Sequence, residues 1–161
     1  MIYLKTDEEV ELMRRSNDLL GRTLAEVAKV IRPGVTTAEL DKVAYEFICD
    51  NGGIPSCLGY EGYPATLCTS VNEQVVHGIP SDKVILKDGD IVSVDTVVKL
   101  GGFCADSAYT FPVGEVAPEV LQLMRTTKQA LYLGIEQAVT GRRLGDIGAT
   151  IQQHCEKAGY S

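Results

Sequence analysis

Two β-branched runs separated by a pair of glycines constrain the fold of this chain most. Residues 91–99 have the composition of a strand, and residues 103–111 have that of a returning strand. Gly101 and Gly102 between them are typical of a two-residue hairpin loop, because glycine readily adopts the positive φ that such loops require. The sequence therefore predicts an antiparallel β-hairpin in the middle of the chain.

Two carboxylates, Asp95 and Asp106, lie inside this predicted hairpin. With the two glycines as the loop, Asp95 lies opposite Ala108 and Asp106 lies opposite Val97. Side chains alternate with period two, so the carboxylates share one face as diagonal neighbours, roughly 7 to 8 Å apart between backbones. A four-residue loop would set them directly opposite each other, whereas a three-residue loop would separate them.

Like charges on one face of a strand pair repel, and burying them unpaired is unfavourable. A divalent metal, a lysine or arginine from elsewhere, or a shared proton could lie between them. The alternative is that both carboxylates face solvent on a wetted sheet face, while the opposite face of the first strand carries the core. That opposite face holds Val92, Val94, Thr96, Val98 and Leu100.

Composition limits the classes of partner. The 161 residues are 45% hydrophobic and 23% charged, which suits one globular domain with a real core. The net charge of −7 argues against DNA or an anionic membrane as the main partner. No apolar run could span a bilayer and the first residues lack a signal-peptide core, so we expect a cytoplasmic protein. Five cysteines without a Cys-x-x-Cys pair favour reduced thiols.

Helical signals precede the hairpin. Capping boxes, Thr6 with Glu9 and Thr36 with Glu39, predict two helix starts. The helices are expected to stop at residues 32–34 and 51–53, and their apolar faces to be Val10, Met13, Asn17, Leu20, Leu24, Val27 and Ile31, then Leu40, Val43, Ala44, Phe47 and Ile48. A Gly/Tyr loop over 54–64 and short strands over 65–71 and 74–77 are expected to follow.

The order of elements then begins again. A helix from Pro118 is expected to run to Gly141, and a shorter one to end before Gly159, with the faces Val120, Met124, Leu131, Ile135 and Ala138, then Ile147, Ile151, Cys155 and Ala158. A constant offset aligns Gly34 with Gly141 and Gly52 with Gly159. The first copy, about residues 7–114, continues into strands, whereas the second, about 117–161, does not. We expect residues 1–161 to be one partial domain of a longer protein; an α+β domain that happens to have two helix pairs is the alternative.

Three motifs then identify a family: residues 57–64 (Cys-Leu-Gly-Tyr-Glu-Gly-Tyr-Pro), residues 72–80 (Asn-Glu-Gln-Val-Val-His-Gly-Ile-Pro), and residues 88–95 (Asp-Gly-Asp-Ile-Val-Ser-Val-Asp) followed by Asp106. In this order they resemble the amino-terminal part of a type I methionine aminopeptidase of the bacterial kind, over essentially the whole chain. The resemblance implies an α+β pita-bread (creatinase/aminopeptidase) fold, with two pseudo-symmetric halves around a dinuclear metal centre and the second half incomplete here.

The resemblance also implies the metal ligands and the catalytic histidine. Asp95 and Asp106 are expected to bind two divalent ions, with Asp106 bridging both, and oxygen donors suit cobalt, manganese, iron or zinc. One His and two Glu ligands belong to the second half and are not found in this chain. His77 is expected to contact the substrate near the scissile bond; from the residues alone, a structural histidine is the alternative. His154 is assigned a packing or surface role.

The Gly/Tyr loop is implied to form the methionine pocket. Cys57, Tyr60, Tyr63 and Cys68 are soft, polarizable or aromatic groups that suit a thioether side chain. Two residues depart from the family: Glu61 stands where it commonly has His, and Val97 where a Thr is usual.

The function implied is removal of the initiator methionine. The expected partners are nascent polypeptides or peptides that begin with Met, and the ribosome. We expect little activity from the 161-residue chain alone, because two carboxylates cannot fill the coordination shells of two ions. A pita-bread module that binds amino termini or ribosomes without cutting, and a related Xaa-Pro peptidase, are the alternatives.

Overall fold

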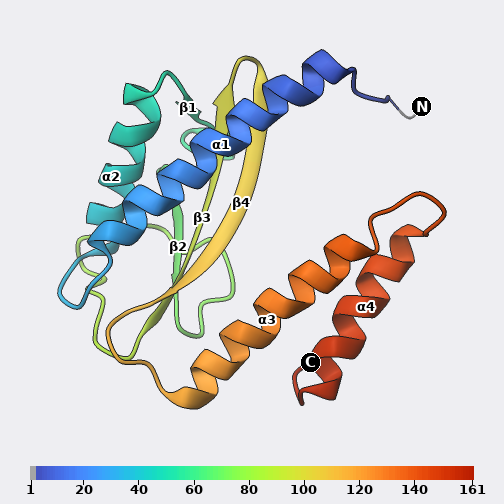
Figure 1. The fold of residues 1–161 in the computed structure, drawn as a ribbon. Coiled ribbons are helices and arrows are strands. Elements are labelled where there is room, and N and C mark those ends of the chain that lie inside the picture. Colours follow the sequence, from blue (N-terminus) through green and yellow to red (C-terminus); the bar gives the residue numbers. More distant parts are fainter. Residues whose placement is uncertain (1–2) are drawn as a thin grey trace. The chain divides into compact units, whose positions relative to one another are not determined.

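Helices and strands are segregated along the chain (Figure 1). In the computed structural model, which describes residues 3–161, two helices precede a four-stranded antiparallel sheet and two further helices follow it. This order confirms the predicted α+β class. The chain divides into a first unit that ends at Val116 and a second unit, Ala117–Ser161.

The helices α1 (Asp7–Val30) and α2 (Thr37–Asp50) begin at the two predicted capping boxes. The face that α1 buries differs from the prediction, since Val10 and Asn17 are exposed. The buried residues of α1 are Ser16, Leu19, Leu20, Thr23 and Val27. Two of these are hydroxyl residues, and burial suits them because each hydroxyl contacts a backbone carbonyl.

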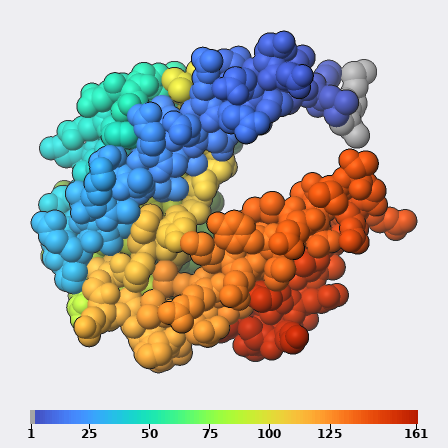
Figure 2. All heavy atoms as spheres, in the orientation of Figure 1, coloured from blue at the N-terminus to red at the C-terminus, as the bar shows by residue number. Residues whose placement is uncertain are grey.

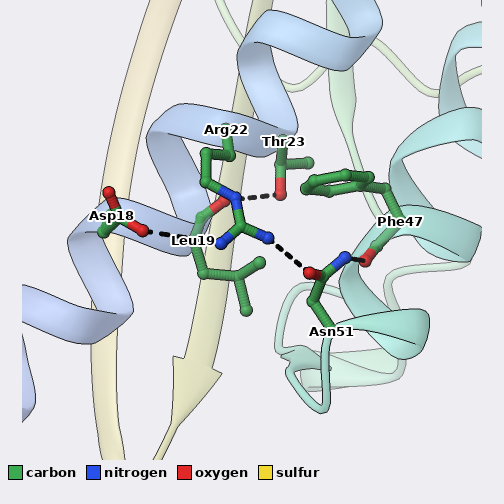
Figure 3. Close-up of polar contacts among 6 residues, drawn as sticks. All are labelled: Asp18, Leu19, Arg22, Thr23, Phe47 and Asn51. Atoms are coloured by element: carbon green, nitrogen blue, oxygen red, sulfur yellow. Dashed lines mark hydrogen bonds and ion pairs between the residues drawn. The ribbon is translucent and has the colours of Figure 1, made fainter.

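A polar cluster joins α1 to the end of α2 (Figure 3). The guanidinium of Arg22 lies 5.4 Å from the ring centre of Phe47 and donates a hydrogen bond to Asn51 Oδ1. Asn51 Nδ2 in turn donates to the Phe47 carbonyl at 2.8 Å, and Asp18 Oδ2 lies 3.6 Å from Arg22 Nη1. The two helices are therefore held together at the surface as well as through the core.

Strand β3 (Ile91–Leu100) is the centre of the sheet. It pairs with β4 (Phe103–Pro112) on one side, and with β2 (Cys68–Val71) and the short β1 (Ile54–Pro55) along different parts of its length. Leu100 pairs with Phe103, so Gly101 and Gly102 form the two-residue loop, with φ of 59° and 89°. The predicted hairpin and its register are confirmed.

One face of β3 carries the core of the first unit. Val92, Val94, Thr96 and Val98 are all buried at 0% exposure, and the three valines pack with apolar residues of α1 and α2, whereas Leu100 of the predicted face is only partly buried. Figure 2 shows the atoms of these two helices side by side over the sheet. The buried hydroxyl of Ser16 lies 3.0 Å from the Leu100 carbonyl oxygen and 2.9 Å from that of Phe103, so α1 also holds the end of the hairpin.

The segment between β2 and β3 differs from the prediction. Residues 74–77 do not form a strand, because Asn72 and His77 both adopt the left-handed conformation, with φ of 53° and 59°. The Gly/Tyr loop holds a 3₁₀ turn, η1 (Tyr60–Gly62), and begins with β1, which was not predicted. The predicted strand over 65–71 is limited to Cys68–Val71.

The second unit is a helical hairpin of α3 (Pro118–Glu136) and α4 (Leu144–Lys157). Pro118 starts α3 as expected, but the helix ends before Gly141, and Leu131 and Ile135 of the predicted face are exposed. The buried residues of α3 are Thr126, Ala130 and Gly134, and small side chains let the two helices approach closely: a Cβ on Gly134 would lie 2.8 Å from Ile151 Cδ1. None of the helices in residues 3–161 is long and apolar enough to cross a membrane.

Candidate metal and substrate site

The two hairpin carboxylates share one face, as predicted from the loop length. Asp95 pairs with Ala108 and Asp106 pairs with Val97, which makes them diagonal neighbours across β3 and β4. On its other side Asp95 pairs with Cys68 of β2, so a thiol lies on the same face. Asp95 is half-buried and Asp106 is exposed. This face of the sheet is therefore partly exposed to solvent and partly buried.

Burial and neighbouring charges change the pKa of Asp95. Burial, followed by the charge of Asp106, raises the pKa of Asp95, while His77 and the Thr96 amide partly offset the shift. The salt bridges that the structure describes lie on α1 and α2, away from both carboxylates.

These residues fit divalent cations, but they supply only part of a site. Paired carboxylates at this spacing are the oxygen donors that hard or borderline ions prefer. Within residues 3–161, no three His, Cys, Asp or Glu side chains form a group that could hold a metal ion. Asp95 and Asp106 would therefore hold ions that take their remaining donors from other groups.

His77 stands at a constrained point of the backbone, and the next residue anchors it. The Gly78 carbonyl accepts a hydrogen bond from the Thr69 amide at 2.7 Å, and the Gly78 amide donates to Ser70 Oγ at 3.2 Å. Gly78 is buried while His77 is exposed and close enough to lower the pKa of Asp95. The imidazole is thus presented to solvent beside the carboxylate face from a fixed backbone.

Three of the four predicted pocket residues lie around the same face. Burial is the main cause that raises the pKa values of the Cys57 and Cys68 thiols, and the charges of Asp95 and Asp106 raise both further. Burial and a hydrogen bond with Cys68 raise the pKa of Tyr63, whose hydroxyl lies 3.0 Å from the Leu67 carbonyl and 3.3 Å from that of Gly78. All three groups stay neutral near pH 7, as a pocket for an uncharged side chain requires.

The other predicted positions differ in where they lie: Val97 is on the site face, whereas Tyr60, Glu61 and His154 are not described in contact with it. Tyr60 is 69% exposed in η1, and no contact described by the structure joins its ring to the other pocket residues. Glu61 beside it is exposed with φ of 48°. Val97 faces Asp106, and its carbonyl accepts from the Ser56 amide at 2.9 Å. His154 is half-buried on α4, and its Nε2 has no hydrogen-bond partner among the described residues.

Sequence reasoning missed Asp41 and the second role of Thr96. Asp41 Oδ1 accepts hydrogen bonds from the amides of Thr66 and Leu67, and Thr96 Oγ1 donates to the Thr66 carbonyl at 2.9 Å. The sequence indicated these roles only weakly. Asp41 directly follows Leu40, at the edge of the apolar face of its helix, and Thr96 is a hydroxyl residue at a core-facing position of its strand.

Comparison with known proteins supplies the family. Residues 11–161 match the sequence pattern of the family described as "Metallopeptidase family M24". The methionine aminopeptidase of Clostridium acetobutylicum is 47% identical over 160 residues, which cover 99% of this chain and 64% of that protein. Methionine aminopeptidase 1 of Bacillus subtilis is 44% identical over 161 residues, covering 100% and 64%. The chain thus spans just under two thirds of the length of these relatives.

Solved structures agree with the sequence relatives. The methionine aminopeptidase from Rickettsia prowazekii matches with a TM-score of 0.97 at 40% identity, over 100% of this chain and 64% of that one. The Xaa-Pro dipeptidase from Bacillus anthracis matches with a TM-score of 0.81 at 20% identity, over 98% of this chain and 42% of that one, and shows a shared fold alone. The pita-bread class expected from the sequence is confirmed, and the chain belongs to metallopeptidase family M24 as a counterpart of part of the bacterial methionine aminopeptidases.

Proposed function

We propose that the protein of which this chain forms part removes the amino-terminal methionine from proteins and peptides. The observation that carries the proposal is the pair Asp95 and Asp106 on one face of the hairpin, beside His77 and a group of neutral thiol and phenol side chains. The relatives named methionine aminopeptidase support the same reaction.

Each group has a part in this proposal. Asp95 and Asp106 hold two divalent ions, of which manganese, cobalt, iron and zinc are candidates. When bound, such ions act as Lewis acids on the scissile carbonyl and yield a strong nucleophile from water at neutral pH. His77 donates a hydrogen bond to the substrate near the scissile bond, because its backbone presents the imidazole beside the carboxylates.

The pocket residues hold the methionine side chain. Cys57, Tyr63 and Cys68 offer polarizable and aromatic surface that suits a thioether, and their raised pKa values keep them uncharged. Tyr60 is assigned to the same pocket and would have to close over the substrate, since its ring is exposed.

The remaining expectations belong to the same proposal. Residues 7–114 and 117–161 are a complete and a begun copy of one repeat, since each opens with two helices. Cytoplasmic nascent chains that begin with Met are the substrates, and the ribosome is a further partner. The relatives are named as aminopeptidases, so no observation favours the non-cutting module.

Hydrolysis of Met-Gly-Met with added manganese or cobalt tests the proposal. The 161-residue chain is compared with a chain extended by the remaining segment of the Clostridium acetobutylicum relative. We expect activity only in the extended chain, its loss in Asp106→Asn, and its retention in the matched surface variant Asp18→Asn. Equal activity of both chains would contradict the account of missing ligands, and an inactive extended chain would overturn the proposed reaction.

A further inference from the structure

Asp41 is a half-buried carboxylate for which the proposed reaction has no use. It lies on α2, and its Oδ1 accepts hydrogen bonds from the backbone amides of Thr66 at 2.9 Å and Leu67 at 2.7 Å. No salt bridge to it occurs within residues 3–161. Burial raises the pKa of Asp41, and the two amide donors partly offset the rise. A single oxygen thus binds two consecutive peptide groups.

Those peptide groups are held from the other direction as well. The Thr66 carbonyl accepts a hydrogen bond from Thr96 Oγ1 at 2.9 Å, and the Leu67 carbonyl lies 3.0 Å from the Tyr63 hydroxyl. Thr66 and Leu67 are 1% and 0% exposed. If one of these hydrogen bonds is lost, water can take its place only when residues 66–67 move. Their position is therefore set by these three side chains.

This segment leads directly into the proposed pocket. Cys68 follows Leu67 and pairs with Asp95 in the register of β2 and β3. The Tyr63 hydroxyl lies 3.0 Å from the Leu67 carbonyl, and its interaction with Cys68 raises the pKa of Tyr63. A displacement of residues 66–67 would consequently move the thiol and the phenol relative to the carboxylate face, although the hydrogen bonds described for Asp41 go to Thr66 and Leu67 and not to Asp95.

We propose that Asp41 is a positioning residue for the substrate pocket: through the amides of Thr66 and Leu67 it fixes Cys68 and Tyr63 against the hairpin. The pocket assignment rests on the proposed function, whereas the positioning itself does not. The positioning depends on the place of the accepting oxygen, whereas the charge of Asp41 is the smallest of the causes that raise the pKa of Cys68. An amide oxygen at the same point should serve, and a carboxylate carried one methylene further should not.

Two conservative variants separate place from charge. Asp41→Asn keeps the oxygen in place and removes the charge, while Asp41→Glu keeps the charge and displaces the oxygen. Glu46→Asp is the matched control, because Glu46 is an exposed acid on the same helix whose contact is an ion pair with Lys42. The readout is the rate at which N-ethylmaleimide labels Cys68 in the 161-residue chain, followed by peptide mapping. Cys49 and Cys104, which are exposed, serve as internal references.

We expect Asp41→Glu to label at Cys68 at least tenfold faster than the parent chain, with Asp41→Asn and Glu46→Asp within threefold. Amide exchange at Val94 and Val98 should not change, which separates local displacement from global unfolding. Equal Cys68 rates in the parent and Asp41→Glu would overturn the proposal. Faster labelling of Cys68 in Asp41→Asn than in Asp41→Glu would also overturn it. So would a labelling rate in Asp41→Glu that rises only as much as amide exchange at Val94 does.

A second readout uses the extended chain. Asp41→Glu should raise KM for Met-Gly-Met at least fivefold, with kcat within threefold of the parent. Asp41→Asn should have the KM of the parent. A fall in kcat with unchanged KM would contradict a role in the pocket. If the extended parent is inactive, the proposed function fails, and the labelling order still decides the positioning role.

Discussion

Replacing Gly78 with alanine tests whether the backbone beside His77 is as tightly anchored as the geometry indicates. A Cβ at this position would lie 2.2 Å from the Thr69 carbonyl oxygen and 2.7 Å from its carbon. An ordinary carbon–oxygen contact is about 3.3 Å, so the segment that holds Gly78 must move away from β2 by about 1 Å. That movement breaks the hydrogen bonds from the Thr69 amide and to Ser70 Oγ.

The expected cost follows from these contacts. Two hydrogen bonds contribute about 1 kcal/mol each, and overpacking against backbone adds about 1 kcal/mol or more, so Gly78→Ala should lose about 3 kcal/mol of unfolding free energy. Gly21 is the matched control in the same unit: it lies within α1, and a Cβ there meets nothing within 4 Å. Gly21→Ala should gain about 1 kcal/mol from helix propensity.

Urea unfolding followed by circular dichroism measures both variants. A chain carrying Gly78→Ala that unfolds within about 0.5 kcal/mol of the parent would refute the reasoning, because residues 77–78 would then move freely. The same variant should displace His77, so in the extended chain kcat for Met-Gly-Met should fall more than the stability loss explains.

Three further predictions concern the anchors and the charges. Ser16→Ala removes the buried hydroxyl that contacts two hairpin carbonyls and should cost about 1 to 2 kcal/mol in urea unfolding; an unchanged midpoint would contradict that anchoring. Asp41 has a raised pKa in the folded state, so its protonated form stabilises the fold below the unfolded value of about 3.9 and this contribution is lost as pH rises through the folded pKa. As pH rises from acid to neutral, the unfolding free energy of the parent should therefore fall relative to that of Asp41→Asn. If the unfolding free energies of the two proteins change in parallel with pH, the raised pKa of Asp41 is disproved. Asp106→Asn relieves repulsion with Asp95, so without added metal it should stabilise the chain by about 0.5 kcal/mol. The same variant should bind manganese at least tenfold more weakly in calorimetry. Tighter manganese binding would rule out a ligand role for Asp106.

The hairpin was predictable because its determinants are local. Gly101 and Gly102 set a two-residue loop, and the period of two then placed Asp95 and Asp106 on one face without any knowledge of the rest of the chain. Helix starts were predictable for the same reason, since each capping box involves residues three apart. Both features depend on contacts that are close in sequence.

The errors arose where distant contacts override local preference. Residues 74–77 have strand-like composition, but left-handed Asn72 and His77 turn the segment, and Gly78 bonds Thr69 and Ser70 instead. The buried face of α1 begins at Ser16, whose hydroxyl finds its acceptors only after the hairpin has packed. Neither effect is visible in hydrophobic periodicity.

The motifs suggested the residues of the proposed site, but they did not reveal the contacts that hold those residues in place. Asp95, Asp106 and His77 were identified from the motifs, and the structure brings Cys57, Tyr63 and Cys68 around them. Asp41 was not identified, because a carboxylate on a helix surface is usually solvated and its two amide donors lie far along the chain.

Strand β3 explains why such supports are needed. Its even-numbered side chains from Val92 to Val98 form the core, whereas Asp95 belongs to the odd-numbered face that carries the proposed site. A slip of one residue would exchange the two faces, burying Asp95 and exposing valines. The Ser16 hydroxyl bonds backbone atoms at the hairpin end, and the Thr96 hydroxyl and the Asp41 carboxylate bond residues 66–67 just before β2, so they help to fix the register on which both faces depend. Core and site are therefore maintained by the same few polar contacts, and loosening one should disturb pocket geometry before it unfolds the chain.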